Sequence, residues 1–134
     1  EIASCLVGSE MCIRDRKYQK DFPKSLDGAP FLMPGEDAAV RPRLIRWFEK
    51  EKVRPRIVGE FDDGALLQAF GEAGKGIFAA PSAVAEQIKK QYGVTEIGRT
   101  NAVSEQFYAI SVERQLTHPA VVAISSAARE SLIR

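Results

Sequence analysis

Apolar residues occur along the chain in two alternating patterns. Short runs of apolar and β-branched residues, which indicate strands, occupy 31–33, 57–58, 76–81, 94–98 and 105–112. Stretches with apolar residues three or four positions apart, which indicate helices, follow the first three runs and close the chain. Strands that alternate with helices predict an α/β fold with a mainly parallel sheet and flanking helices.

The first predicted helix begins after Glu36 and Asp37 and runs to about residue 51. Pro42 must lie in its first turn, where a missing N–H leaves no hydrogen bond unmade. The expected apolar face consists of Val40, Leu44, Trp47 and Phe48, with Ile45 at its edge. The opposite, solvated face is expected to carry Arg43, Arg46, Glu49, Lys50 and Glu51.

The second unit is a strand, a tight acidic turn and a helix over residues 57–71. Asp62 is expected to cap the helix, and Asp63 to lie in its first turn, where negative charge suits the helix dipole. The spacing of Leu66, Phe70 and Ala73 predicts that these residues face the core.

The third unit pairs the apolar run Gly76–Pro81 with a helix over 82–92. The run does not alternate, so it predicts a strand buried on both faces. Ser82 is the expected N-cap and Gly93 the expected stop. A last helix is expected to open at Thr117-His118-Pro119, with Val121, Ile124, Ala128 and Leu132 on its inner face.

Parallel sheets bind ligands at the carboxyl ends of their strands. By this rule the acidic turn at Asp62 and Asp63 and the turn at Pro81-Ser82 share one rim. Two interpretations are open for the carboxylates of Glu36, Asp37, Glu60, Asp62 and Asp63: helix capping and ordinary surface charge, or a cation-attracting rim of hard oxygen ligands. A helix N-terminus repels cations, so one aspartate cannot serve well both as the cap and as a cation ligand.

The composition limits the possible functions. The chain has 134 residues, enough for one domain, with 45% hydrophobic and 28% charged residues. A net charge of +1 gives no indication of nucleic-acid or membrane binding. No apolar run reaches the roughly 18–20 residues of a spanning helix. We therefore expect a globular protein that does not bind a membrane.

The sequence offers little catalytic chemistry. Gly71–Gly76 lacks the glycine spacing and the Ser or Thr of a phosphate-binding loop, and no nucleophile elbow is present. His118 is the only histidine, and its place at a helix start favours a structural or solvated role over catalysis. We expect neither an enzyme, nor a metal site, nor a bound cofactor.

Residues 1–16 differ from the rest of the chain. The stretch from Cys5 to Arg16 resembles a peptide obtained when sequencing-adapter DNA is translated, and it lacks the features of a secretory signal. We expect it to be non-native, the alternative being a genuine N-terminal strand or helix. Both cysteines lie in this segment, so disulfide or thiol chemistry is not expected elsewhere.

The stretches 59–63, 65–66 and 69–71 together resemble the effector-binding part of LysR-type transcriptional regulators. More narrowly, they are similar to those members that activate the gene of a sodium–proton antiporter. Supporting stretches follow in the family's order at 32–35, 44–48, 77–81, 96–99, 108–111, 113–114 and 118–121. The resemblance covers most of residues 22–132.

The resemblance implies one Rossmann-like subdomain of the type 2 periplasmic-binding-protein fold. Residues 17–101 would form the second subdomain, while 102–134 would supply the crossover strand and final helix of the first. The DNA-binding domain and the main body of the first subdomain would lie outside this fragment. The last helix would then lack its packing partner, so we expect it to be loosely docked or covered by another chain.

The same resemblance implies a regulatory function. The fragment would sense an effector for a cytoplasmic, DNA-binding activator that forms dimers or tetramers, and the effector would be sodium, alone or with alkaline pH, or a small molecule. The expected effector-cleft residues are Gly35, Glu36, Phe61, Asp62, Asp63, Pro81 and Ser82. The alternative is a lobe of a solute-binding protein with the same bilobal fold.

Overall fold

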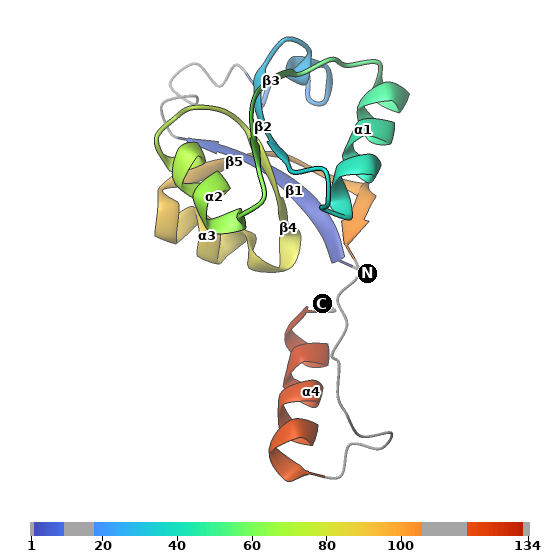
Figure 1. Cartoon of the computed structure of the whole chain (residues 1–134), viewed down its shortest axis with the longest axis vertical. Coiled ribbons are helices and arrows are strands. Elements are labelled where there is room, and N and C mark those ends of the chain that lie inside the picture. Colours follow the sequence, from blue (N-terminus) through green and yellow to red (C-terminus); the bar gives the residue numbers. More distant parts are fainter. Residues whose placement is uncertain (1, 10–17, 106–117, 133–134) are drawn as a thin grey trace.

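The computed structural model describes residues 2–9, 18–105 and 118–132. The strands are β1 (Ile2–Ser9), β2 (Pro30–Pro34), β3 (Arg56–Phe61), β4 (Phe78–Pro81) and β5 (Val94–Glu105). The α-helices are α1 (Val40–Glu51), α2 (Gly64–Glu72), α3 (Ala85–Tyr92) and α4 (Pro119–Leu132), and short 3-10 turns occupy Lys24–Leu26 and Ser82–Val84. Figure 1 shows β1–β5 and α1–α3 as one α/β body.

The strands form two sheets, β3-β2 and β4-β1-β5, which are joined by an isolated parallel bridge into one mixed array in the order β3-β2-β4-β1-β5. β2 and β3 pair in parallel, and β1 pairs antiparallel with both β4 and β5. The two sets meet where Leu32 N donates to Ile77 O and Ile77 N donates to Pro30 O, both at 2.8 Å. β2, β3 and β4 therefore run in the same direction, as the α/β pattern predicts.

The hydrophobic core lies on both faces of this sheet, because successive residues of a strand point to opposite faces. On one face Phe31, Met33 and Ile77 pack with Trp47 and Phe48 of α1. On the other face Leu32 and Phe78 pack with residues of α2 and α3. In Figure 1 α1 accordingly lies on one side of the sheet and α2 and α3 lie on the other.

The predicted faces of α1 are confirmed, whereas the predicted inner face of α2 is wrong. Leu44, Trp47 and Phe48 are buried and Ile45 lies at the boundary, 38% exposed. In α2 Leu67 and Gly71 are buried, while Leu66 and Phe70 are 51% and 43% exposed. The reason is that α2 approaches β4 closely at Gly71, and this contact rotates the predicted stripe away from the core.

The predicted helix ends are partly confirmed. The N-cap of α2 is Asp63, not Asp62: its Oδ1 accepts from Ala65 N at 2.8 Å. Ser82 lies in a 3-10 turn that precedes α3, so the expectation that its side chain caps this helix is wrong. Gly93 ends α3 with φ of 59°, as predicted.

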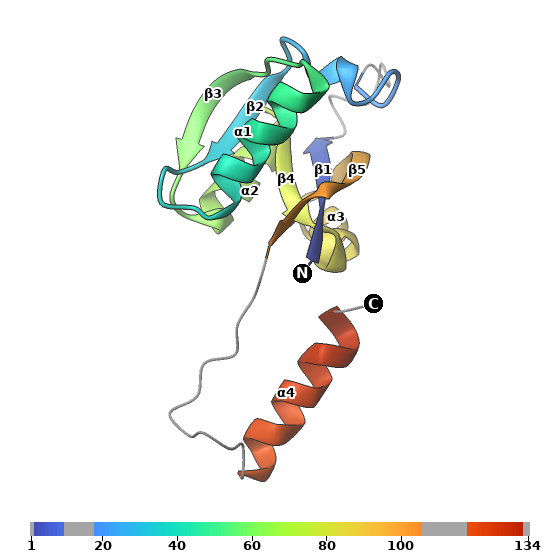
Figure 2. The ribbon, with the colours of Figure 1, turned by 90° about the vertical axis from the view of Figure 1, so that its right-hand side faces the viewer.

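The C-terminal strand is longer than the sequence pattern predicts. β5 continues to Glu105, beyond the strand predicted at 94–98, and most of the strand predicted at 105–112 lies outside the described residues. α4 lies apart from the α/β body in Figures 1 and 2, and Val121 and Ile124 are exposed. His118 is exposed and its Nδ1 accepts from Ala120 N at 3.2 Å, which supports the structural role expected of it.

The N-terminal segment has a definite place in the sheet. Ile2–Ser9 forms β1, the strand between β4 and β5, which corresponds to the alternative expectation of an N-terminal strand. Residues 10–16 lie outside the described ranges. Near the other predicted boundary, at 101/102, β5 runs on without a break and Val103 is fully buried in the core beside α1.

Candidate functional site

The predicted cleft residues follow three strands that run in the same direction. Gly35 and Glu36 follow β2, Phe61 ends β3, and Pro81 ends β4. Asp62 and Asp63 continue from β3, and Ser82 continues from β4. Because parallel strands end at the same edge of a sheet, the fold places the seven predicted residues along one rim.

The first two turns of this rim touch directly. Gly35 N donates to Phe61 O at 2.7 Å. A Cβ built on Gly35 would lie 1.9 Å from Oδ1 of Asp62. Only glycine at position 35 therefore leaves room for the Asp62 carboxylate where it stands.

The carboxylates of the rim are not equivalent. Asp63 is engaged as the cap of α2, and Glu60 forms an ion pair with Arg41 at 2.9 Å. Asp62 and Glu36 are exposed carboxylates with no ion pair among the described residues. No group of three or more His, Cys, Asp or Glu side chains converges as a metal site in the part of the chain that the structure describes.

Arg41 is a rim residue that the sequence pattern missed. Its Nη1 donates to Pro34 O and its Nη2 to Glu60 Oε1, both at 2.9 Å. It therefore joins the start of α1 to the ends of β2 and β3. The available signal was its position in the first turn of α1, where positive charge opposes the helix dipole and requires a compensating partner.

Ser82 contributes an unpaired polar atom to the rim. Its Oγ is buried and has no hydrogen-bond partner among the residues that the structure describes. A buried hydroxyl left unsatisfied costs about 1–3 kcal/mol. Ser82 therefore differs from the exposed carboxylates of Glu36 and Asp62, because its polar atom is covered and could meet a ligand only if the turn at Pro81-Ser82 shifts.

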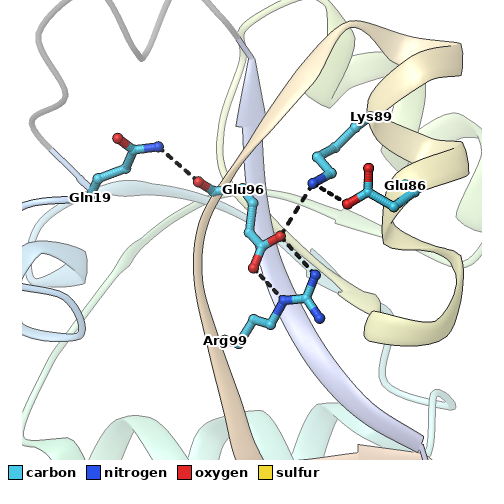
Figure 3. Close-up of polar contacts among 5 residues, drawn as sticks. All are labelled: Gln19, Glu86, Lys89, Glu96 and Arg99. Atoms are coloured by element: carbon cyan, nitrogen blue, oxygen red, sulfur yellow. Dashed lines mark hydrogen bonds and ion pairs between the residues drawn. The ribbon is translucent and has the colours of Figure 1, made fainter. Parts of the chain in front are cut away.

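A separate ionic network lies away from the rim and holds α3 against β5 (Figure 3). Lys89 Nζ contacts Glu86 Oε1 at 2.5 Å and Glu96 Oε2 at 3.4 Å. Arg99 pairs with the same Glu96 carboxylate through its Nε and, at 3.0 Å, through its Nη2. Gln19 donates to Glu96 O at 2.9 Å, so the segment before β2 is attached to the same strand.

These contacts shift two pKa values in opposite directions. Hydrogen bonding from Arg99 lowers the pKa of Glu96 below its usual 4.5, with further lowering by the charges of Arg99 and Lys89. The hydrogen bond to Glu86 raises the pKa of Lys89 above 10.5. The network therefore contributes fully to stability between pH 4.5 and pH 10.5, the usual pKa values of the two groups. It weakens when either side chain loses its charge.

Replacing Glu96 with Gln is expected to lower the free energy of unfolding at pH 7 by less than about 1 kcal/mol, since the network is partly exposed. Because the folded pKa is depressed, the contribution of Glu96 is present above pH 4.5 and is lost as the pH falls through the folded pKa. Urea titrations at pH 7 and pH 3 measure this. The exposed Glu72, which has no ion pair in the described ranges, provides the control Glu72→Gln, and an equal deficit for Glu96→Gln at both pH values would contradict the prediction.

The fold and rim define a class of protein. A parallel set of strands with helices on both faces, and with polar turns gathered at their carboxyl ends, is the architecture of α/β ligand-binding lobes, among them those of type 2 periplasmic-binding-like effector domains. The chain belongs to the LysR substrate binding domain family, whose profile matches residues 16–132. This is a non-enzymatic domain of transcriptional regulators, which confirms the expectation that the chain is not an enzyme.

Similar proteins agree with this assignment. The chain is 40% identical over 103 residues to the Transcriptional activator protein NhaR of Escherichia coli K12, covering 77% of this chain and 34% of that protein. The NhaR protein of Shigella flexneri matches equally well. The chain thus spans about a third of the length of these relatives, and the family resemblance inferred from its residues is confirmed.

Solved structures support the fold. The CcmR regulatory domain of Synechocystis in complex with 2-PG aligns over 98% of this chain and 63% of its own, with a TM-score of 0.61 and 11% identity. The effector-binding domain of QuiR in complex with shikimate aligns over 97% and 61%, with a TM-score of 0.52 and 15% identity. At such identities the likeness concerns the fold alone. Among the described residues no helix is long and apolar enough to cross a membrane.

Proposed function

We propose that this chain is the effector-sensing part of a LysR-type activator that responds to sodium, or to sodium with alkaline pH, and controls a sodium–proton antiporter gene. The 40% identity to NhaR supports the assignment to this branch of the family. The observation that supports the sensing role is the rim, where the Asp62 carboxylate lies against Gly35 and the buried Ser82 hydroxyl has no partner within the described ranges. Membership of the LysR substrate binding domain family favours this regulatory function over that of a lobe of a solute-binding protein.

The effector would bind at Gly35, Glu36, Phe61, Asp62, Asp63, Pro81 and Ser82. Of these, Asp62 and Glu36 are the carboxylates left free of capping and ion pairing among the described residues. Sodium prefers oxygen ligands, as other hard cations do. Because three such side chains do not converge within the described residues, the sodium site would require ligands from across the cleft, on the first subdomain.

Sodium ligands divided between the two subdomains would couple sodium binding to closure of the cleft. A cation that contacts oxygens on both sides of the cleft binds the closed form better than the open one, and it shifts the population toward closure by that difference in affinity. The angle between the subdomains would then set the spacing of the DNA-binding domains in a dimer or tetramer. DNA would be bound only through the N-terminal domain of the complete, cytoplasmic protein.

In a full-length version, the double change Glu36→Gln and Asp62→Asn is expected to abolish most of the sodium response of DNA binding. Amides keep the size of the side chains but remove the charges that attract a cation. Gel shifts of the promoter DNA over a sodium series, with potassium at matched ionic strength, measure the response.

The control is the double change Glu49→Gln and Glu72→Gln, which removes the same charge from exposed positions at the opposite ends of α1 and α2. It should leave the sodium midpoint unchanged. A normal sodium response in the Glu36 and Asp62 variant would refute the coupling of these carboxylates to sodium, while the family assignment would stand.

We also propose the domain limits that the resemblance implies. Residues 17–101 would constitute the second subdomain, and 102–134 would return to the first. The exposed apolar side chains of α4 agree with a helix that packs on a subdomain outside this chain. Residues 1–16 would be non-native, which agrees with a family match that begins at residue 16.

A further inference from the structure

A basic groove lies on the flank of α1, beside β5 and outside the seven rim residues. Its lining residues are Arg43, Arg46, Trp47, Lys50 and Ala102, and its volume is about 190 Å³. The four residues from α1 are spaced three or four positions apart, so they lie on one side of the helix. Ala102 supplies the wall from β5.

The three cations of the groove have no carboxylate partner in the described part of the chain. Arg43 donates to the backbone carbonyl of Ser104, and Arg46 Nε makes a long contact of 3.4 Å with Pro42 O. Elsewhere Arg41, Lys89 and Arg99 are paired with glutamates, whereas Lys24 and Lys90 are exposed single cations without an ion pair in the described ranges. The basic groove is distinguished by having three such unpaired cations around one hollow.

Helix stability does not account for this charge. Lys50 lies in the last turn of α1, where the helix dipole favours a cation, but Arg43 lies near the helix start, where the dipole opposes one. Like charges on one helix face also repel each other. A bound anion would relieve both effects, and guanidinium groups match the oxygens of phosphate in a fork geometry.

The groove is large enough for a small anion. Its volume is several times the roughly 30 Å³ that one water occupies in the liquid, and it is open to solvent on one side. The buried Trp47 ring offers an apolar wall beside the charges. A phosphate group with at most a few attached carbon atoms fits this combination of volume, charge and wall.

We propose that the basic groove is a binding site for a small phosphate-bearing anion, either free phosphate or a small phosphate monoester. The site is distinct from the acidic rim in residues and in charge. It also touches the segment that includes Ala102 and Ser104, which Arg43 holds against α1.

Trp47 is the only tryptophan of the chain, so its fluorescence reports on this groove directly. The complete 134-residue chain is titrated with inorganic phosphate and, separately, with glycerol 2-phosphate, at ionic strength held constant with chloride. A saturable change in Trp47 emission, confirmed by calorimetry, is expected with at least one of the two. Tighter binding of the ester would identify the monoester as the preferred source, and equal binding would identify the phosphate group alone.

The double change Arg46→Gln and Lys50→Gln should weaken binding roughly tenfold or more, because it removes two charge-assisted contacts. Both side chains are exposed and make no ion pair in the described ranges, so the fold should persist, which the thermal midpoint checks. The control Lys24→Gln and Lys90→Gln removes two exposed cations elsewhere and should bind as the unmodified chain does.

Three results would overturn the proposal. One is a change in Trp47 emission with phosphate that is no larger than the change with chloride alone at equal ionic strength. Another is equal phosphate affinity in both double variants. The third is that a short DNA duplex binds saturably while neither phosphate compound binds. This result would make the groove a nucleic-acid contact.

Discussion

A chain that begins at Lys17 is expected to lose its cooperative thermal unfolding transition. β1 pairs with β4 at four positions and with β5 at eight, and it is the only strand that joins them in the described sheet. β4 and β5 both run antiparallel to β1, so without it each presents an unpaired edge. At about 1 kcal/mol for each net hydrogen bond, the loss is comparable with the whole stability of a small domain, about 5–15 kcal/mol.

Circular dichroism during heating measures this loss. The matched control is a chain truncated after Glu105, which removes a longer segment but keeps all five strands. It should retain a sharp transition, because α4 lies apart from the α/β body (Figure 2). An unchanged midpoint for the chain that begins at Lys17 would show that β1 adds nothing to the fold.

This prediction is compatible with a foreign origin of residues 1–16. The pairing of β1 with its neighbours depends on backbone N–H and C=O groups, which every residue other than proline provides. A segment of unrelated sequence can therefore occupy a strand position between β4 and β5 that the sheet leaves open. The position requires an antiparallel strand, and it does not require this particular sequence.

Replacing Gly71 with Ala is expected to destabilise the chain by about 1–3 kcal/mol, although alanine is the better helix former by about 1 kcal/mol. A Cβ at Gly71 would lie 2.2 Å from Cε1 of Phe78. Phe78 is fully buried, so its ring has no free space into which to move. Overpacking therefore outweighs the gain in helix propensity. Urea unfolding monitored by Trp47 fluorescence measures the difference.

The control is Gly64→Ala, in the same helix. A Cβ at Gly64 meets nothing within 4 Å, so this change should leave the stability unchanged or raise it by up to about 1 kcal/mol. A Gly71→Ala variant as stable as Gly64→Ala would show that α2 does not rest on Phe78 as the structure has it.

The two helices α1 and α2 show how far a periodic pattern can be trusted. In α1 the large apolar side chains lie on one face, and most other positions are charged. Only that face can be buried, and it was predicted correctly. In α2 apolar residues surround the helix, and Leu66 and Leu67 are neighbours in sequence. The choice between them depends on Gly71, whose missing side chain sets how closely the helix approaches Phe78.

The gathering of three turns at one edge of the sheet could be predicted from the sequence because it follows from topology. Once three strands are known to run parallel, their following turns must gather at one edge, and Gly35, Asp62 and Ser82 belong to those turns. Topology does not determine which partner each carboxylate of the rim binds. Asp63 rather than Asp62 caps α2, and Arg41 neutralises Glu60, because these outcomes depend on side-chain geometry within a few ångströms.

The sequence by itself determined the α/β class, the helices of the body to within a few residues and the family, because apolar spacing and local motifs are properties of neighbouring residues. Tertiary structure alone decided three features: the buried face of α2, the place of β1 between β4 and β5, and the basic groove between α1 and Ala102. Each of these depends on residues far apart in the chain, and contacts between such residues leave no period in the sequence.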